Sequence, residues 1–303
     1  MKLFSGLFCY DWSSSNNVVY YLHIFSNKIA SQQYVGSMMK KVVACMLVAL
    51  ALSGCKTSPT GRTQIMLYPE QQMDEMGVAS FDQIKSKQAI ESEKSSNQYV
   101  SCIADALIAQ LPNKYASQKW EVVVFKDDSA NAFALPGGKI GVNTGLLKVA
   151  KNQHQLAAVM GHEVGHVIAQ HANERVSQSS LLQAGLQVSN AVMQMNNIEY
   201  RNTIMQGLGV GAQVGIALPF SRSHETEADI IGLELMAKAG FKPIGAVELW
   251  QNMEKLGGER PMEFLSTHPS PDNRIQRLNN KMHSANSLYQ AAKQQGLSPN
   301  CKM

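Results

Sequence analysis

The sequence predicts an α+β fold that is mainly helical, with one small β-sheet beside a buried helix. Apolar residues recur at helical spacing along much of the chain, and only residues 120–143 combine β-branched and aromatic residues with turn signals. An HExxH sequence lies inside one of the helical patterns. The part of the chain beyond a predicted leader, about 250 residues, suits one compact domain.

The first 54 residues have the character of a leader. Residues 1–38 show neither a helical nor an alternating pattern, whereas residues 39–54 have a basic start, a short apolar core and small residues at the end. We therefore expect residues 1–38 to be a misannotated extension, with synthesis starting at Met38 or Met39. The alternative is an unusually long leader.

The signal ends in Leu-Ser-Gly-Cys, which resembles a bacterial lipobox. Cleavage before Cys55 and acylation of its sulfur would tether the mature chain to a membrane by lipid. Lysine rather than aspartate follows the cysteine. By resemblance to lipoprotein sorting in Gram-negative bacteria, this predicts the periplasmic face of the outer membrane.

Charge and cysteine content agree with export. Four lysines and one aspartate lie in residues 1–54, so the 27 basic and 23 acidic residues of the chain reduce to 23 and 22. A nearly neutral chain with no basic patch argues against nucleic acid as a partner. Cys102 and Cys301 either form one disulfide in an oxidising compartment or remain two separate thiols.

The mature chain is expected to divide into a lipidated tether over 55–69, a compact domain over 70–285 that contains the HExxH sequence, and a C-terminal tail over 286–303. Helical stripes cover residues 73–84 and 99–107, ahead of the β region.

The β region predicts a strand over residues 120–125 and then a hairpin around Pro136-Gly137-Gly138. The first strand of that hairpin is expected at an edge of the sheet. An extended substrate can add to such an edge through backbone hydrogen bonds. The residues expected in this role are Asn131, Ala132, Phe133, Ala134 and Leu135.

The HExxH sequence places two imidazoles and a carboxylate on one helix. His162 and His166 are one turn apart and share a helical face, while Glu163 is free to act on a metal-bound water. Asn152 is a suitable N-cap for this helix. A third metal ligand is expected from elsewhere, because a catalytic zinc usually takes three protein groups.

Glu225 is the candidate third ligand. Asp229 follows it by one helical turn, so both carboxylates lie on one face. Asp229 is then placed to accept the free ring N–H of a ligand histidine and to fix its tautomer.

Together these motifs resemble a known family. His162-Glu163-x-x-His166, then Glu225-x-x-Ala228-Asp229, then Thr267-His268-Pro269 with Arg274 are similar to the zinc peptidase family of the CAAX prenyl protease. The likeness covers roughly residues 56–285 and is greatest to the periplasmic and lipoprotein branch of the BepA and LoiP type. It implies a zincin-like (gluzincin) metalloprotease domain.

The resemblance also assigns roles to residues. It implies one Zn²⁺ per chain with His162, His166 and Glu225 as ligands, Glu163 as the base and Asp229 behind a ligand. His268 lies at the active site, where it either stabilises the oxyanion or caps the zinc at rest. Arg274 is either an oxyanion donor or the partner of a carboxylate behind the ligands.

The other histidines are expected to lie outside the chemistry. If the HExxH helix continues, His171 is rotated about 140° from His166 and His154 is offset by about 80°. His224 and His283 are expected to be simple polar residues.

Three hypotheses follow for function. The leading one is a membrane-anchored zinc endopeptidase that acts on misfolded or stalled envelope proteins. The second is a latent metalloprotease that works mainly as a periplasmic chaperone or assembly factor for outer-membrane proteins, in contact with the assembly machinery. The third, a structural lipoprotein with a degenerate site, is disfavoured because every expected catalytic position is filled.

Overall fold

The computed structural model describes residues 55–202, 204–206, 221–256, 263–268 and 273–303. The predicted extension and signal segment, residues 1–54, lie outside these ranges. The chain divides into two units, Met1–Leu67 and Tyr68–Met303. None of the helices within the described residues is both long enough and apolar enough to cross a membrane.

The described part of the first unit is a small hairpin. Strand β1 (Cys55–Thr57) pairs antiparallel with β2 (Thr63–Ile65). Gly61 closes the turn with a φ of 89°, a left-handed conformation that glycine adopts without strain. The segment predicted as a tether therefore contains local β-structure.

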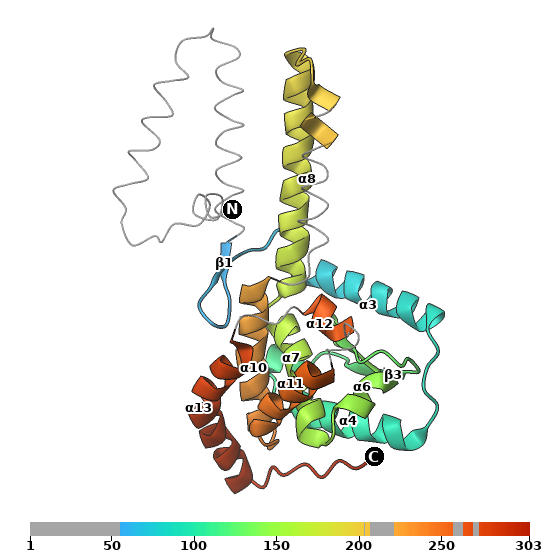
Figure 1. Cartoon of the computed structure of the whole chain (residues 1–303), viewed down its shortest axis with the longest axis vertical. Helices are drawn as coiled ribbons and strands as arrows, with labels where there is room; N and C mark the ends of the chain where they lie inside the picture. Colours follow the sequence, from blue (N-terminus) through green and yellow to red (C-terminus); the bar gives the residue numbers. More distant parts are fainter. Residues whose placement is uncertain (1–54, 203, 207–220, 257–262, 269–272) are drawn as a thin grey trace, which may run out of the picture. The chain divides into compact units, whose positions relative to one another are not determined.

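The second unit is mainly helical with one small sheet, as the sequence predicts (Figure 1). Helices α3 (Glu70–Lys87) and α4 (Lys94–Ile108) come first and coincide with the two helical stripes. A short helix, α5 (Asn113–Ala116), leads into the sheet.

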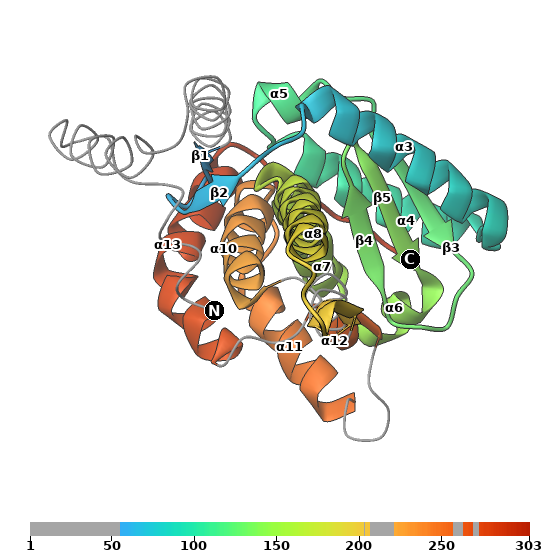
Figure 2. The same cartoon turned by 90° about the horizontal axis from the view of Figure 1, so that it is seen from above.

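Three strands form the sheet, in the order β3-β5-β4. β3 (Glu121–Phe125) runs parallel to β5 (Lys139–Asn143), and β4 (Ala132–Leu135) pairs antiparallel with β5 around the predicted turn. β4 is therefore an edge strand, and Figure 2 shows it on the side of the sheet that faces α7.

The remaining helices build the core. After α6 (Thr144–Val149) come α7 (Gln153–Ile168) and α8 (His171–Met195). Helices α10 (Arg222–Lys238), α11 (Ile244–Leu256), α12 (Glu263–Thr267) and α13 (Arg274–Gln294) follow. α7 packs against α4, α10, α11 and β4 and is buried along most of its length.

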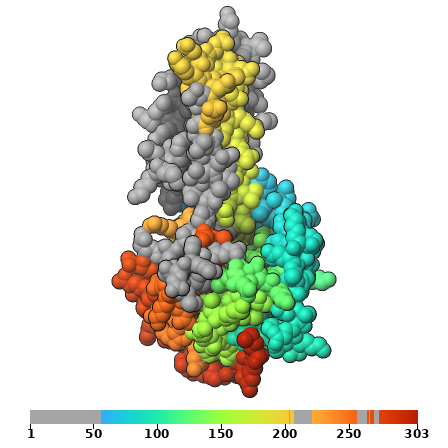
Figure 3. All heavy atoms as spheres, turned by 45° about the vertical axis from the view of Figure 1, so that its right-hand side comes forward, coloured from blue at the N-terminus to red at the C-terminus, as the bar shows by residue number. Residues whose placement is uncertain are grey.

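Helix α8 differs from α7, because its second half lies at the surface (Figure 3). Its exposed apolar residues include Leu181, Leu182, Val188, Val192 and Met195. The GxGxG sequence and the apolar run that follow at 207–220 lie outside the described residues.

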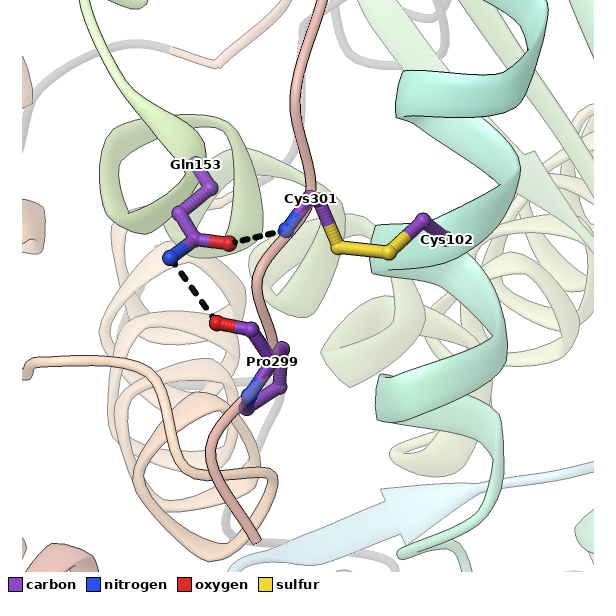
Figure 4. The surroundings of a disulfide bond; sticks show 4 residues. All are labelled: Cys102, Gln153, Pro299 and Cys301. Atoms are coloured by element: carbon purple, nitrogen blue, oxygen red, sulfur yellow. Dashed lines mark hydrogen bonds between the residues drawn. A yellow bond between two sulfur atoms is a disulfide. The ribbon is translucent and has the colours of Figure 1, made fainter.

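The C-terminal segment is tied to the core in two ways (Figure 4). Cys301 forms a disulfide with Cys102 of α4. The amide of Gln153, at the start of α7, accepts the backbone N–H of Cys301 at 2.8 Å and donates to the carbonyl of Pro299 at 3.0 Å. The residues after 285 thus continue α13 and then return to the start of α7.

Candidate functional site

Helix α7 presents the HExxH residues from its middle. Its N-cap is Asn152, whose side-chain oxygen accepts the backbone N–H groups of His154 and Gln155. His162, Glu163 and His166 are all buried, being 3–4% exposed. Polar groups so deeply buried require partners, and the neighbouring helix supplies them.

Helix α10 approaches α7 closely because glycines face each other at the crossing. A Cβ on Gly232 would lie 2.6 Å from the backbone nitrogen of His162, and one on Gly161 would lie 3.0 Å from the carbonyl oxygen of Gly232. Any larger side chain would separate the two backbones. The close approach brings the Glu225 carboxylate within reach of both histidine rings and the Asp229 carboxylate within reach of His162.

Four donor groups converge between these helices. His162, His166, Glu225 and His268 each offer one ligand atom, and these atoms lie within 4.8 Å of one another. The Nε2 atoms of His162 and His166 are 3.1 Å apart. The Glu225 carboxylate lies 3.3 Å from the first and 3.4 Å from the second. Within the described ranges, these four residues are the one group of His, Cys, Asp or Glu side chains that could hold a metal ion.

A carboxylate and a guanidinium support His162 from behind. Nδ1 of His162 lies 2.9 Å from the Asp229 carboxylate, which leaves Nε2 directed at the cluster. Asp229 in turn accepts Nε–H of Arg274 at 2.8 Å. Such a carboxylate behind a ligand histidine fixes the tautomer that binds metal through Nε2.

Arg274 connects the two carboxylates of α10. Its Nη2 donates to Glu225 at 2.7 Å while its Nε donates to Asp229, and its guanidinium stacks 3.8 Å from the ring centre of Trp250. The side chain is only 1% exposed. Of the two roles that the sequence leaves open, this placement favours holding the carboxylates.

His268 lies inside the cluster rather than at its rim. Its Nδ1 is 3.1 Å from Glu225 and 3.4 Å from Nε2 of His162, and its Nε2 is 3.5 Å from Glu163. The ring stacks on Phe264 at 4.6 Å. A fourth donor at this distance can complete a tetrahedral metal site.

Glu163 lies beside the cluster, next to His162 on α7. Its Oε1 is buried and forms no hydrogen bond within the described residues, and the backbone N–H of Ala134 bonds to the carboxylate. Burial raises the pKa of Glu163, which the positive charge of nearby histidines partly offsets. A carboxylate with a raised pKa is suited to taking and returning a proton near neutral pH.

The carboxylates of α10 favour the protonated form of His162. Burial disfavours the charged ring, but hydrogen bonds to Asp229 and Glu225 outweigh this and raise the pKa of His162 to about 10. Burial lowers the pKa of His166. Although burial alone would raise it, hydrogen bonds from the three histidines hold the pKa of Glu225 well below its usual range. A metal that binds here must displace a proton.

The cluster fits zinc. Zinc prefers imidazole nitrogen and carboxylate oxygen in a four-coordinate arrangement, and these are the donors present. The ring nitrogens that face away from the cluster have their own partners, so Nε2 of each α7 histidine is directed at the shared site. Three imidazoles and one carboxylate do not match the oxygen ligands that a hard cation such as Mg²⁺ prefers.

An opening beside the cluster leads along the edge strand. It is a small, partly open hollow of about 50 Å³, whose lining includes His166 of α7, Ala134 of β4, Met73 of α3 and Tyr115. Within the predicted edge strand, Asn131 to Leu135, Ala134 thus both bonds to the base through its backbone and lines the hollow. Strand β4 itself begins at Ala132.

A second group of buried histidines was not predicted from the sequence. The offset of about 140° that sets His171 aside assumes an unbroken helix, but α7 ends at Ile168 and Gln170 has a φ of 55°. The left-handed residue interrupts the helix there, and Nδ1 of His171 comes to lie 2.8 Å from Nδ1 of His166. A left-handed residue that is not glycine gives no signal in the sequence.

His224 also differs from the expectation of a simple polar residue. It is 2% exposed, stacks on the His171 ring at 4.3 Å and lies 3.0 Å from the Glu174 carboxylate. His154 accepts the backbone N–H of Lys242, away from the cluster, and His283 is exposed.

Comparisons with known proteins agree with this geometry. The chain is 36% identical over 182 residues to the mitochondrial metalloendopeptidase OMA1 of Schizosaccharomyces pombe, covering 59% of this chain and 51% of that protein. It is 31% identical over 244 residues to OMA1 of Danio rerio, covering 76% and 50%. It is 25% identical over 212 residues to the β-barrel assembly-enhancing protease of Escherichia coli, covering 68% and 43%.

The chain thus spans about half or less of the length of these relatives. The sequence model of peptidase family M48 matches residues 94–282, which include all four donor residues and Glu163. Members of this family are zinc metallopeptidases with a zincin-like domain. The chain belongs to peptidase family M48.

Proposed function

We propose that the chain is a membrane-anchored, zinc-dependent endopeptidase that cleaves misfolded or stalled proteins of the bacterial envelope. The observation that carries the catalytic part is the placement of Glu163. Its carboxylate is buried beside the four donor groups and is also bonded to the backbone of the edge strand. The base, the metal ligands and a strand that can bind substrate thus meet at one place.

The chemistry follows from these positions. Zinc, when bound, would activate a water and polarise the peptide carbonyl. Glu163 accepts the proton of the attacking water and passes it to the leaving amine. Asp229 and Arg274 hold His162 and Glu225 in place during this exchange.

The substrate class is argued from β4. An extended segment that pairs with β4, the outermost strand of the sheet on that side, would be recognised through its backbone, and its side chains could enter the hollow beside His166. Backbone recognition favours unfolded or loop segments over one sequence motif. This agrees with a role in quality control of envelope proteins.

The catalytic proposal is tested with the purified full-length protein, an unfolded casein substrate and a measurement of bound zinc. Glu163→Gln should retain zinc and fold but lose at least 10²-fold in turnover, since general acid–base catalysis contributes on that order. Glu234→Gln is the matched control, because it makes the same change at a half-exposed site on α10. Substantial cleavage by Glu163→Gln would refute the assignment of the base.

A second candidate function rests on His268. Because its ring already lies among the ligand atoms, it can fill the position that a catalytic zinc leaves for water. The chain would then be a latent protease that acts mainly as a chaperone or assembly factor. His268→Ala separates the two: it should raise cleavage if His268 blocks the site at rest, and lower it if His268 stabilises the oxyanion.

The location and partners rest on the sequence and on the relatives. The Leu-Ser-Gly-Cys sequence supports lipid attachment at Cys55, and the name of the E. coli relative supports contact with the β-barrel assembly machinery. Cys55→Ser should leave the chain unlipidated and shift it from the membrane to the soluble fraction, as mass spectrometry and fractionation would show. Full membrane retention of Cys55→Ser would argue against the lipid anchor.

A further inference from the structure

The two histidines of α7 are supported in different ways. His162 contacts a carboxylate directly, whereas the Nδ1 atom of His166 lies 2.8 Å from a second histidine, His171. His171 is 0% exposed, and its Nε2 lies 3.1 Å from the carboxylate of Glu227 on α10. A series of close contacts therefore leads outward from His166 to the ring of His171, the first residue of α8, and then to the carboxylate of Glu227.

Metal binding at His166 would select one assignment of protons along this series of contacts. Nε2 of His166 points at the shared cluster, where it must be a lone pair to bind metal, so its Nδ1 carries hydrogen. That N–H donates to Nδ1 of His171, which must then be an acceptor. Nε2 of His171 therefore carries the hydrogen and donates to Glu227.

We propose that His171 and Glu227 form a positioning relay that fixes the tautomer and ring orientation of His166 for zinc binding. Carboxylates and carbonyls behind a ligand histidine serve this purpose generally, and their loss typically weakens metal binding about 10–100-fold. Here a neutral imidazole with a carboxylate behind it takes the place of the single carboxylate. The inference rests on the proposed zinc site and extends it to two residues outside the cluster.

A second pair braces the first. The His224 ring stacks on the His171 ring at 4.3 Å with an interplanar angle of 24°. Its Nε2 lies 3.0 Å from Glu174, one turn into α8, and that carboxylate is 5% exposed. Two histidine–glutamate pairs thus lie between α8 and α10, and each crosses from one helix to the other. This packing leaves the His171 ring little freedom to turn away from His166.

The alternative is that these residues only fill space between helices. A packing role depends on volume, whereas a positioning role depends on the acceptor at Nδ1 and on the charge behind it. Variants that keep volume and remove the acceptor therefore separate the two. Measurement of zinc affinity, rather than activity, reports directly on His166.

The test uses the full-length protein, with zinc dissociation constants from competition against a chromophoric chelator and with the visible spectrum of the Co²⁺ form. His171→Leu, which lacks the acceptor, should weaken zinc about 10–100-fold and alter the Co²⁺ spectrum. His171→Asn, which keeps an oxygen acceptor near the position of Nδ1, should lose less than 10-fold. His283→Gln, at an exposed histidine of α13, is the control and should bind as the wild type.

Glu227→Gln, alone and combined with His171→Leu, completes a double-mutant cycle. It keeps the volume but removes the charge, and should weaken zinc at least threefold in the wild-type background. In the His171→Leu background it should have no further effect, because the relay is already broken. If His171→Leu does not fold, the Asn and Gln variants carry the test.

The relay is refuted if folded His171→Leu, or Glu227→Gln, binds zinc within twofold of the wild type. It is also refuted if the two changes add without coupling. A wild-type chain that binds no zinc would refute both the relay and the proposed function. Zinc bound tightly by the wild type and by both variants would refute the relay alone.

Discussion

The network around α10 and the ion triad at the sheet both join acidic and basic side chains, but the first is buried throughout and the second is centred on a partly exposed carboxylate. In the first, Arg274 bonds Asp229 and Glu225, and none of the three side chains is more than 8% exposed. In the second, Glu121 of β3 accepts from Lys85 at 2.6 Å and from Lys139 at 3.0 Å. Glu121 is 37% exposed and Lys85 is 24% exposed, while Lys139 is buried at 9%.

The difference teaches which charges the fold depends on. A buried ion that loses its partner keeps the cost of desolvation, whereas a surface ion recovers its hydration from water. The buried network also serves the proposed chemistry, since its members touch His162 and the donor cluster. We expect stability to be concentrated there, and the following changes test this from the largest effect to the smallest.

The largest effect is expected for Arg274→Ala. It leaves two buried carboxylates without their shared partner, so the free energy of unfolding should fall by about 3–5 kcal/mol. Arg274→Lys should recover part of this, because one ammonium cannot match the forked geometry of a guanidinium. Urea unfolding in the presence of a chelator measures the effect without a contribution from metal.

Gln276→Ala is the control for this change, since it truncates an exposed residue on the same helix. It should alter the free energy of unfolding by less than about 0.5 kcal/mol. A loss below about 1 kcal/mol for Arg274→Ala would show that the fold does not depend on the buried network.

Much of the fold could be predicted from local patterns in the sequence. The cap at Asn152, the helix over the HExxH residues and the hairpin around Pro136 to Gly138 depend on neighbouring residues, and the structure confirms each of them. The mainly helical fold with one small sheet is confirmed as well. The parallel pairing of β3 with β5 was not foreseen, because it depends on contacts between strands that a pattern cannot register.

Sequence patterns also failed to predict those parts of the site that depend on contacts between distant residues. Glu225 and Asp229 could be placed on one face from their spacing, but the choice between roles for Arg274 needed distances in space. The relay of His171 and Glu227 was missed because it depends on the end of α7 at Ile168 and on a left-handed turn at Gln170. Neither glycine nor proline marks that turn, so only buried contacts specify it.

Metal should add a smaller increment of stability. The donor atoms come from separate helices, so the folded chain binds zinc and the unfolded chain does so much less well. At free zinc one hundred times the dissociation constant, the gain is about 2.7 kcal/mol. For a domain of this size that raises the Tm by about 5–10 °C, which calorimetry with and without chelator would show.

The Glu121→Gln variant should gain as much from zinc as the wild type, because its change lies outside the donor cluster. His166→Asn, which lacks one donor, should gain much less. An equal gain in His166→Asn would place the stabilising zinc elsewhere than in this cluster.

The smallest effect is expected at the triad itself. The hydrogen bond from Lys85, followed by that from Lys139, lowers the pKa of Glu121 below its usual 4.5 despite partial burial. A carboxyl with a depressed pKa stabilises the fold above its unfolded pKa, and this contribution disappears as the pH falls through the folded value. Glu121→Gln should therefore cost less than about 1 kcal/mol at pH 7 and less still at acidic pH.

Salt distinguishes this triad from the buried network. Raising the ionic strength to about 1 M shortens the screening length to about 3 Å, so the cost of Glu121→Gln should shrink while that of Arg274→Ala persists. Asp128→Asn breaks a pair with Lys148 in which both side chains are more than two-thirds exposed, and it should cost less than Glu121→Gln. If Glu121→Gln instead cost as much as Arg274→Ala, burial would not be what distinguishes the two groups of charges.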